Sequence, residues 1–289
     1  MRHRRLPEVP KLTPLFRLMK SFWTKLPTPA QRRLARWFGR RPCRIQMASP
    51  VISFTFDDFP RSALLTAGTI LRERGFAGTY YASFGLMGRK SPTGEIFARE
   101  DLDELVRQQH ELACHTFDHC DSWETDPAEF EASIQRNQRT AAEPLPGSKL
   151  RSLSYPISWP RPETKRRVAT YYECARGGGQ TFNAGTVDLN YLKAFFIEQS
   201  RGNFGEIKQV VDANARAKGW LIFATHDVCE SPTRFGCTPD LFERIVEYSA
   251  KSGAVVLPVH AALLRIRQDE KRSLPVGSTE NSPVFNTTR

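Results

Sequence analysis

The sequence predicts an α/β fold in which helices surround a parallel sheet or barrel. Short β-rich runs alternate with longer segments whose apolar residues recur at helical spacing, and glycines end several of these segments. Polar residues come directly after several of the apolar runs. This alternation is typical of βα units, and such folds form their binding sites in the loops that follow the strands.

The predicted elements alternate along residues 51–257. The β-rich or extended runs are 51–56, 79–84, 111–115, 150–155, 172–175, 194–197, 220–225 and 254–257. The helical segments are 62–74, 101–109, 127–142, 162–170, 204–218 and 239–252. In the first of these helices, Leu64, Leu65, Ile70 and Leu71 have helical spacing and Gly75 ends the pattern.

Three parts of the chain differ in composition. Residues 1–46 contain several prolines and many basic residues, and we expect an N-terminal extension with only short helices. Residues 47–266 carry the alternating pattern and are predicted to form the folded domain. Residues 267–289 are polar and include glycine and proline, so we expect a disordered tail.

The positive charge is concentrated at the start of the chain. Residues 1–41 contain 12 of the 42 Lys and Arg and one of the 31 acids, so the remainder holds 30 of each and is neutral. A neutral domain argues against nucleic-acid binding, which usually needs a basic face. The basic segment also contains apolar side chains such as Phe22 and Trp23, and it predicts peripheral contact of residues 1–41 with an anionic membrane. The alternative is an extension that packs on the domain.

Two further features concern the cellular compartment. The sequence shows no run of about 20 apolar residues that could span a bilayer and no clear secretion signal, so we expect a cytoplasmic protein peripheral to the inner membrane. The six cysteines form no CxxC pair, which argues against a zinc ribbon, and most are expected to be buried or free thiols. Cys229 and Cys237 could form a disulfide in an oxidising compartment.

Three polar clusters follow predicted strands. Asp57 and Asp58 follow the first strand, His115 and His119 the third, and His226 the seventh. Taken singly, paired acids after a strand are more often a helix cap, and a lone histidine there is more often structural. A histidine pair at i and i+4 directs both imidazoles the same way and is able to bind one metal ion.

Together these clusters supply the groups that metal-assisted amide hydrolysis requires. Two imidazoles and one carboxylate leave coordination positions open for water and substrate, as catalytic zinc requires. Consecutive residues at a strand end point in different directions, so one aspartate can bind the metal while its neighbour acts as general base. The separate His226 is then available as general acid for the leaving amine.

Five segments also resemble, in order and spacing, the motifs of the polysaccharide deacetylases, the carbohydrate esterase group that includes the NodB-type chitooligosaccharide deacetylases. They are Thr55–Asp58, His110–Cys114, His115–His119, Leu153–Pro156 and Phe223–Asp227. The resemblance implies a deformed (β/α) barrel of seven or eight strands. It also implies one divalent metal ion, often zinc, and removal of N-acetyl groups from the amino sugars of a poly- or oligosaccharide or a lipid-linked glycan.

The resemblance implies a role for each matched residue. The general base is Asp57 and the general acid is His226. The metal ligands are Asp58, His115 and His119.

Supporting roles and departures from the family pattern follow from the same comparison of motifs. Thr116 is expected to shape the metal loop by hydrogen bonding, and the backbone N–H of Ile157 to stabilise the oxyanion. Phe59 stands where the family usually has glycine, and Ile157-Ser158 replaces Tyr-Gly after the proline of the third motif. Both changes are expected to alter the cleft lining.

The fourth family motif, normally Asp-Trp, is not visible in the sequence. Arg176, at the end of a predicted strand, is the nearest candidate for a charged partner of Asp57 or His226. A surface arginine before the glycines at 177–179 is the alternative interpretation. Asp188 is a weaker candidate for the same role.

Other functions fit parts of the pattern. The same two-histidine, one-carboxylate set is the ligand triad of Fe(II) oxygenases, although that class explains neither Asp57 nor His226. A non-catalytic carbohydrate-binding protein on the same fold is the second alternative, and occupation of all five catalytic positions argues against it. Chitin oligomers, peptidoglycan, exopolysaccharides and lipid-linked sugars all fit as substrates. The aromatic residues that could stack on sugar rings are Trp123, Tyr155 and Trp159.

Overall fold

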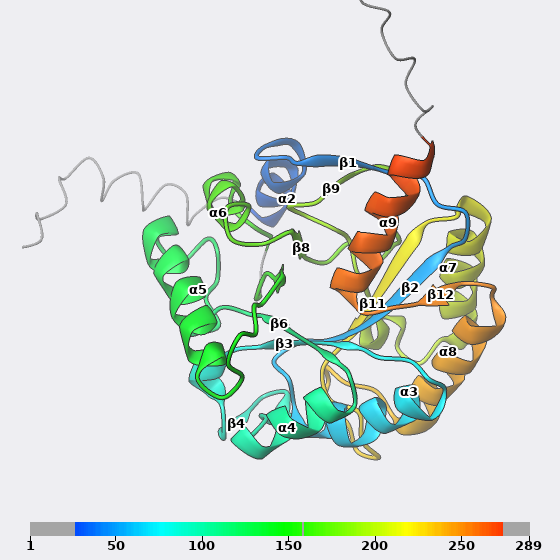
Figure 1. Cartoon of the computed structure of the whole chain (residues 1–289), viewed down its shortest axis with the longest axis horizontal. Coiled ribbons are helices and arrows are strands. Elements are labelled where there is room, and N and C mark those ends of the chain that lie inside the picture. Colours follow the sequence, from blue (N-terminus) through cyan, green and yellow to red (C-terminus); the bar gives the residue numbers. More distant parts are fainter. Residues whose placement is uncertain (1–26, 158, 274–289) are drawn as a thin grey trace, which may run out of the picture.

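The computed structural model describes residues 27–157 and 159–273. Within them, one parallel sheet curls into an incomplete barrel with helices outside it (Figure 1). Its strands are β2 (Val51–Phe56), β3 (Thr79–Ala82), β6 (Glu111–Cys114), β7 (Ser152–Ser154), β8 (Cys174–Arg176), β10 (Phe195–Phe196), β11 (Trp220–Thr225) and β12 (Val255–Val256). Their order is β10-β11-β2-β3-β6-β7-β8, with β12 beside the start of β2. The predicted α/β fold and deformed barrel are confirmed.

Strand β2 lies at the centre of this sheet. All six of its residues are buried, because β11 pairs with its whole length on one side while β12 and β3 share the other. A strand covered on both faces is apolar along most of its length. Its two hydroxyl side chains are satisfied internally: Trp220 Nε1 donates to Ser53 Oγ at 3.0 Å, and Thr55 Oγ1 donates to the carbonyl of Phe223 at 2.7 Å.

The edge strands β8 and β10 do not pair directly, and the segment that connects them bridges the gap. The N–H of Leu192 donates to the carbonyl of Ala175 at 2.8 Å, and the N–H of Gly177 donates to the carbonyl of Leu192 at 3.0 Å. This contact brings the ends of the two strands together, and the guanidinium of Arg176 lies 5.8 Å from the ring centre of Phe196.

Helices cover the outside of the barrel (Figure 1). Side chains of Asp126, Asn203 and Thr238 accept backbone N–H groups at the starts of three of them, which explains where these helices begin. A π-helical turn, Ala63–Gly68, continues into α3. The helices are α2 (Thr28–Trp37), α3 (Thr69–Glu73), α4 (Arg99–Arg107), α5 (Pro127–Ala142), α6 (Pro162–Val168), α7 (Phe204–Ala217), α8 (Pro239–Lys251) and α9 (Val259–Ser273).

Shorter elements extend the barrel. Two antiparallel pairs are formed by β1 (Pro42–Ile45) with β9 (Gly185–Asp188) and by β4 (Lys90–Ser91) with β5 (Gly94–Glu95). Two 3-10 turns, η2 (Phe84–Leu86) and η3 (Ile197–Ser200), follow β3 and β10. The β4–β5 hairpin and η3 both contribute residues to the pocket described below.

The described part of the predicted N-terminal extension packs on the barrel. The ammonium group of Lys165, in α6, is buried and donates to the carbonyl oxygens of Ala35 and Phe38 at 2.7 and 2.9 Å. It also forms an ion pair with Asp188 of β9 at 2.6 Å. Helix α2 is therefore held against the domain. Residues 1–26 lie outside the described residues, so the membrane contact of the basic segment stays a prediction.

Both predicted domain boundaries lie next to or inside regular structure. The boundary at residue 46 follows β1 directly, and the boundary at residue 266 lies inside α9, where Arg267 forms an ion pair with Glu173. The helix therefore includes the first residues of the predicted tail, and residues 274–289 lie outside the described part. None of the described helices is long and apolar enough to cross a membrane.

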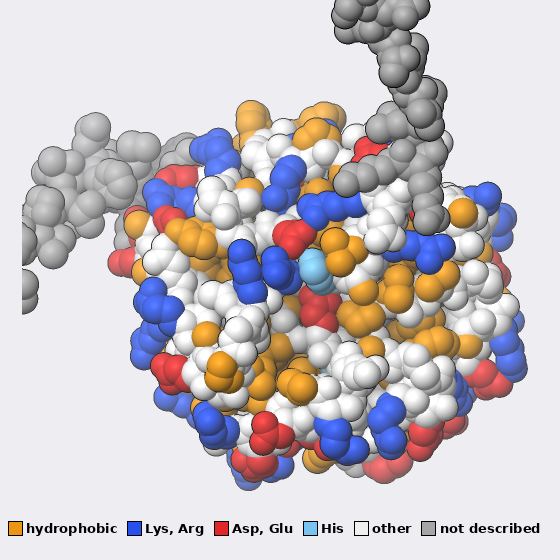
Figure 2. Space-filling view, in the orientation of Figure 1, with side chains coloured by type: hydrophobic (Ala, Val, Ile, Leu, Met, Phe, Trp, Pro, Cys, Tyr) orange, Lys and Arg blue, Asp and Glu red, His pale blue; other side chains and the backbone are white. Residues whose placement is uncertain are grey.

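The surface charge is consistent with the neutral composition of the domain. On the face shown in Figure 2, basic and acidic side chains alternate around the rim, and further basic side chains lie near the centre beside the exposed histidine. The exclusion of nucleic acid as a partner remains a prediction from composition.

Candidate metal and catalytic site

The carboxyl ends of four strands meet at one pocket. Asp57 and Asp58 follow β2, His115 follows β6, Arg176 ends β8 and His226 follows β11. The pocket has a volume of about 1050 Å³, and all of these residues except Arg176 line it. Arg176 is buried and reaches the pocket through its contact with Asp57.

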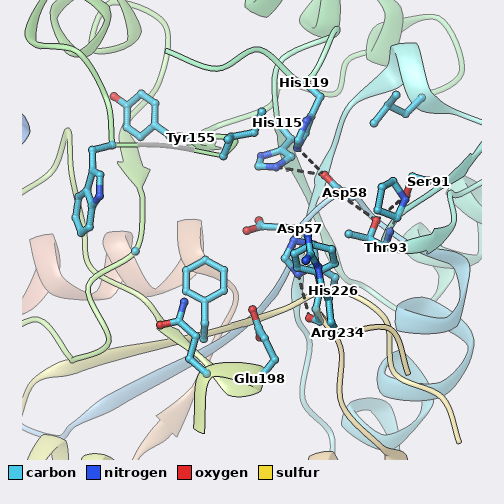
Figure 3. Close-up of a pocket in the computed structure, with 18 of the residues that line it drawn as sticks. Asp57, Asp58, Ser91, Thr93, His115, His119, Tyr155, Glu198, His226 and Arg234 are labelled. Carbon is cyan, nitrogen blue, oxygen red and sulfur yellow. Dashed lines mark hydrogen bonds and ion pairs between the residues drawn. The ribbon is translucent and has the colours of Figure 1, made fainter. Parts of the chain in front are cut away.

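Asp58, His115 and His119 form a compact cluster in this pocket (Figure 3). Nε2 of His115 lies 3.4 Å and Nε2 of His119 lies 3.1 Å from Asp58 Oδ1. The three candidate ligand atoms all lie within 4.8 Å of one another, so a single divalent ion could contact all of them. Asp58 Oδ1 is buried and has no well-directed hydrogen-bond donor among the described residues.

Hydrogen bonds orient two of these side chains. Nδ1 of His115 lies 2.9 Å from the carbonyl oxygen of Ser154, so Nδ1 carries the proton and the lone pair of Nε2 is directed toward Asp58. Thr93 Oγ1 donates to Asp58 Oδ2 at 2.9 Å, which leaves Oδ1 for a metal ion. Burial lowers the pKa of His115 to about 4, so the imidazole is neutral, as a ligand must be.

Asp57 belongs to a different interaction from its neighbour Asp58. Its Oδ1 forms an ion pair with Arg176 at 2.5 Å, and both side chains are almost fully buried. Burial alone would raise the pKa of Asp57, but the positive charge of Arg176 and the nearby His115 and His226 outweigh burial and lower it. The guanidinium lies 4.7 Å from the ring centre of a buried tyrosine. The candidate base is therefore held ionised and in one orientation.

His226 contributes a second imidazole to the pocket. Its Nδ1 lies 3.1 Å from the carbonyl oxygen of Phe235, so Nδ1 is the protonated nitrogen and Nε2 remains available to the pocket. Asp227 has a separate role, because its carboxylate accepts the N–H of Thr233 at 2.7 Å and the Thr233 hydroxyl at 2.6 Å. This carboxylate organises the loop after β11.

The loops that carry the site hold non-glycine residues in left-handed backbone conformation. The φ angle is between 54° and 62° at Asp58, Phe59, Thr116, His119 and Ile157, which are five of the nine such residues described. Each costs on the order of 1 kcal/mol or more and persists only where the surrounding structure enforces it. The concentration of strain here is typical of a functional site.

Thr116 and Ile157, the two residues for which supporting roles were predicted, lie at or next to the pocket. Thr116 is fully buried, and its Oγ1 accepts the N–H of Cys120 at 2.9 Å, which closes the loop that carries His119. The Ile157 side chain is 73% exposed and lines the pocket. Their roles in hydrolysis stay predictions.

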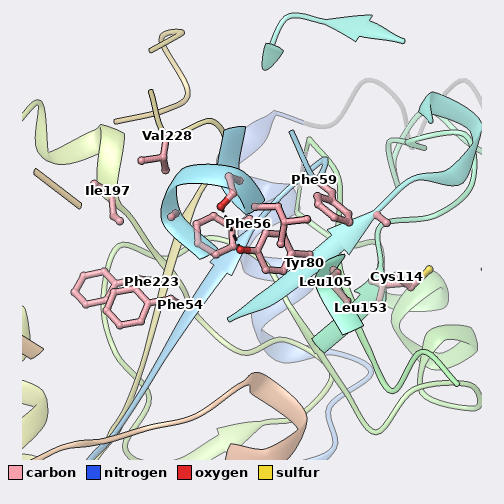
Figure 4. Packing of buried hydrophobic residues seen from close by; sticks show 14 of the residues in the cluster. Phe54, Phe56, Phe59, Tyr80, Leu105, Cys114, Leu153, Ile197, Phe223 and Val228 are labelled. Carbon is pink, nitrogen blue, oxygen red and sulfur yellow. Dashed lines mark hydrogen bonds between the residues drawn. The ribbon is translucent and has the colours of Figure 1, made fainter. Parts of the chain in front are cut away.

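Phe59 does not line the cleft, contrary to the prediction. Its ring is fully buried, stacks on Phe97 with centroids 4.6 Å apart, and lies 4.9 Å from the ring of Tyr80 (Figure 4). Because the chain turns sharply at two consecutive left-handed residues, the ring is directed into the core. The substitution of the usual glycine therefore changes the core beneath the site.

Two residues of the pocket were missed by the sequence analysis. Thr93 comes from the β4–β5 hairpin, which has no recognisable motif. Glu198, in η3, lines the pocket, and its Oε2 is buried with no hydrogen-bond partner among the described residues. Burial raises the pKa of Glu198 to about 8. Glu198 directly follows a predicted strand, so the strand-end rule could have found it. Asp188, the weaker candidate partner, pairs with Lys165.

The cysteines take no part in the candidate site. All six are free thiols. Cys229 and Cys237 are neighbours in the loop after β11, where the N–H of the first donates to the carbonyl of the second at 3.3 Å.

Comparison with known sequences agrees with the geometry. The family model for polysaccharide deacetylases matches residues 44–173. This span includes Asp57 and the three candidate ligands, and it ends before Arg176. No curated protein sequence matches the chain significantly.

Solved structures share the fold at low sequence identity. The peptidoglycan deacetylase PdaC from Bacillus subtilis aligns with a TM-score of 0.53 and 15% identity, over 78% of this chain and 95% of that one. The CE4 domain of a multidomain xylanase from the hindgut metagenome of Trinervitermes trinervoides gives 0.52 and 17%, over 77% and 92%. A CE4 family pseudoenzyme from Bacillus anthracis gives 0.52 and 11%, over 76% and 67%. The family match over residues 44–173 and the shared fold confirm the resemblance of this chain to the polysaccharide deacetylases.

Proposed function

We propose that the protein is a metal-dependent N-deacetylase that removes acetyl groups from the amino sugars of a glycan. One observation carries the proposal: the Asp57–Arg176 pair and His226 share a pocket with the Asp58 cluster. A purely structural metal site would need neither an ionised base nor an acid beside it. Hydrolysis of an amide needs both.

The three candidate ligands fit a divalent ion, and we propose zinc. Two imidazole nitrogens and one carboxylate oxygen are the donor set of many catalytic zinc sites, and the buried Asp58 Oδ1 has no other partner. When bound, the ion would act as a Lewis acid toward the acetamide carbonyl and would make water more acidic.

The other residues of the pocket carry the proton transfers in this proposal. Asp57 accepts the proton of the attacking water, and Arg176 keeps Asp57 ionised and fixed in position until then. In its doubly protonated form, His226 gives the Nε2 proton to the amine nitrogen as the carbon–nitrogen bond breaks, while Nδ1 keeps its hydrogen bond to the carbonyl of Phe235. The backbone N–H of Ile157 donates to the oxygen that gains negative charge.

The pocket suits a sugar. Trp159 and Phe196 line it and can pack on the apolar faces of pyranose rings, whereas Trp123 and Tyr155 are buried and offer no open ring face, although Tyr155 lies at the pocket wall. PdaC is a peptidoglycan deacetylase and another neighbour is part of a xylanase, so the shared fold serves different glycans. The fold alone therefore does not indicate whether the substrate is a chitin oligomer, peptidoglycan or a lipid-linked sugar.

The test is acetate release by the full chain reconstituted with zinc, measured across acetylated glycan classes. Asp57→Asn should keep the metal and lose about 10²–10⁴-fold in rate, as removal of a general base does. The matched control is Asp103→Asn, an exposed aspartate of α4, which should match wild type. An active Asp57→Asn enzyme would show that the base is misassigned.

The same assay separates the alternatives. A non-catalytic carbohydrate-binding protein, as the pseudoenzyme neighbour illustrates for this fold, would bind glycans and release no acetate. The Fe(II) oxygenase alternative gains no support from the comparisons, and it leaves the Asp57–Arg176 pair unexplained.

A further inference from the structure

A second cavity opens beside the active-site pocket. It has a volume of about 340 Å³ and shares Arg32, Trp159, Gly178 and Gly179 with the larger pocket, so the two cavities adjoin. We call this cavity the basic groove. Its positively charged side chains are Arg32, Arg36, Arg40 and Lys193.

Among the described residues, no acidic side chain forms an ion pair with the basic side chains of the groove. Asp188 is the one described acid that lines it, and its carboxylate already pairs with Lys165 at 2.6 Å. The same carboxylate accepts the backbone N–H groups of Arg41 and Asn190 at 2.9 and 3.0 Å. Within residues 27–157 and 159–273, none of the four basic side chains forms an ion pair.

The basic side chains are close enough to affect one another. Partial burial lowers the pKa of Lys193, and the positive charges of Arg36 and Arg32 lower it further. Arg32 lies at the junction of the two cavities, with its guanidinium 5.0 Å from the ring centre of Trp159. Like charges held together in a cavity favour binding of an anion between them.

The glycine loop after β8 also lines the groove. The N–H groups of Gly178 and Gly179 donate no hydrogen bond within the described part of the chain. A Cβ at Gly179 would lie 3.0 Å from Cβ and Cγ of Lys193, so glycine lets the lysine pass close to the loop. Free backbone N–H groups beside cations form a common site for oxyanions.

We propose that the basic groove binds a phosphate-type anion of the substrate, so that the amino sugar at the metal site carries a phosphate or diphosphate. This inference rests on the proposed function, because it places an acetylated sugar in the adjoining pocket. Four cationic side chains and two backbone donors match the charge and the several oxygens of phosphate better than those of one carboxylate. A neutral chitin-like chain needs none of them.

The N-terminal extension then completes the substrate site. Arg32 and Arg36 lie on α2 and Arg40 follows it, so three of the four cations come from the N-terminal extension, and all four lie outside the family match at 44–173. The bonds from Lys165 to Ala35 and Phe38 hold that segment in place. The extension therefore distinguishes this chain from a deacetylase of neutral polymers.

The first test measures binding without catalysis. Inorganic pyrophosphate is titrated calorimetrically into the full chain freed of divalent metal, so that binding through the metal is excluded. The double variant Arg36→Ala/Lys193→Ala should weaken binding about tenfold or more, since each lost bond to a charged group has an effect of this size. The control Arg33→Ala removes an exposed arginine of the same helix that does not line the groove, and it should bind as wild type. Equal affinity in all three proteins, or no binding, overturns the inference.

The second test measures substrate preference with the zinc-loaded enzyme. The ratio of kcat/KM for N-acetylglucosamine 1-phosphate to that for neutral diacetylchitobiose should fall about tenfold in Arg36→Ala and stay unchanged in Arg33→Ala. A polyprenyl-linked form of the same sugar phosphate, in detergent, distinguishes a lipid-borne anion from a soluble one. A preference for either phosphorylated form that depends on Arg36 supports the inference.

The two proposals fail in different ways. Suppose that neutral glycans are hydrolysed at least as fast as phosphorylated ones and that Arg36→Ala leaves the kcat/KM ratio unchanged. The groove inference is then wrong and the deacetylase proposal stands. If no acetylated glycan releases acetate while pyrophosphate still binds through Arg36 and Lys193, the groove is a binding site and the deacetylase proposal is wrong.

Discussion

The two ends of the barrel both carry histidines and carboxylates, but they use them differently. At the amino end, the buried carboxylate of Glu111 accepts hydrogen bonds from Thr79 Oγ1 at 2.9 Å, Ser152 Oγ at 3.1 Å and the N–H of His260 at 2.9 Å. His260 Nε2 in turn lies 3.1 Å from Glu173. Both Glu111 oxygens therefore have partners.

At the carboxyl end, several buried polar atoms have no well-directed hydrogen bond among the described residues. They include Asp58 Oδ1, Nε and Nη1 of Arg176, and Glu198 Oε2. Buried polar groups are usually hydrogen-bonded, so a concentration of exceptions beside a pocket indicates places reserved for a ligand. Residue type alone does not distinguish Glu111 from Asp58 and Glu198, whereas the hydrogen-bond satisfaction of their carboxylate oxygens does.

The strongest test of this contrast exchanges one histidine at each end for alanine. His115→Ala should lose the bound metal and all hydrolysis, because it removes one of three ligands. His260→Ala should keep both and lose about 1 kcal/mol of stability with its side-chain hydrogen bond to Glu173, because the backbone bond to Glu111 remains. Metal content of the purified, zinc-reconstituted proteins and acetate release give the answer. Full metal retention by His115→Ala would contradict the ligand assignment.

A second test addresses the buried pair at the carboxyl end. Arg176 lowers the pKa of Asp57, so Arg176→Met should raise it and move the acidic limb of the pH–rate profile to higher pH. Leaving Asp57 buried without its partner should also cost roughly 3–5 kcal/mol of stability. Rates are measured from low to neutral pH on protein shown to be folded by circular dichroism. An acidic limb at the same pH in Arg176→Met and wild type would show that Arg176 does not control the ionisation of the base.

The smallest expected effect concerns Glu198. Its pKa is raised to about 8 by burial, so between its ordinary value and pH 8 the folded state holds a proton that the unfolded state has lost. Wild-type stability should therefore fall with rising pH across this window, and Glu198→Gln should flatten the fall by up to a few kcal/mol. Thermal unfolding at pH 5 and pH 8 measures the difference, with exposed Glu230→Gln as control. Parallel curves for wild type and Glu198→Gln would mean that Glu198 is ionised in the fold.

The sequence predicted the residues of the site better than their surroundings. Asp57, Asp58, His115 and His226 follow strands, and strand ends converge in a parallel barrel, so their proximity follows from the pattern. For Arg176, the sequence left two interpretations open: a charged partner in the site, or a surface arginine before the glycines. The structure places it beside Asp57.

Features that depend on tertiary packing could not be predicted from the sequence. The burial of Phe59 depends on a left-handed turn that its residue type disfavours. Thr93 reaches Asp58 through a hairpin from a distant loop, and no local pattern encodes that contact. The docking of α2 depends on Lys165, a residue type that is almost never fully buried unless paired.

The buried centre of the sheet determines how the protein should respond to a chelator. Strand β2 and its neighbours form a core of fully buried apolar side chains, and the residues that would hold a metal stand at its edge. We therefore expect the domain to fold without metal, unlike a small zinc-nucleated module. Removing a bound ion should lower stability only by mass action, about 2.7 kcal/mol for a ligand at a hundred times its Kd. Inactivation by chelation should accordingly be reversible, with activity restored by adding the ion back to a protein that never unfolded.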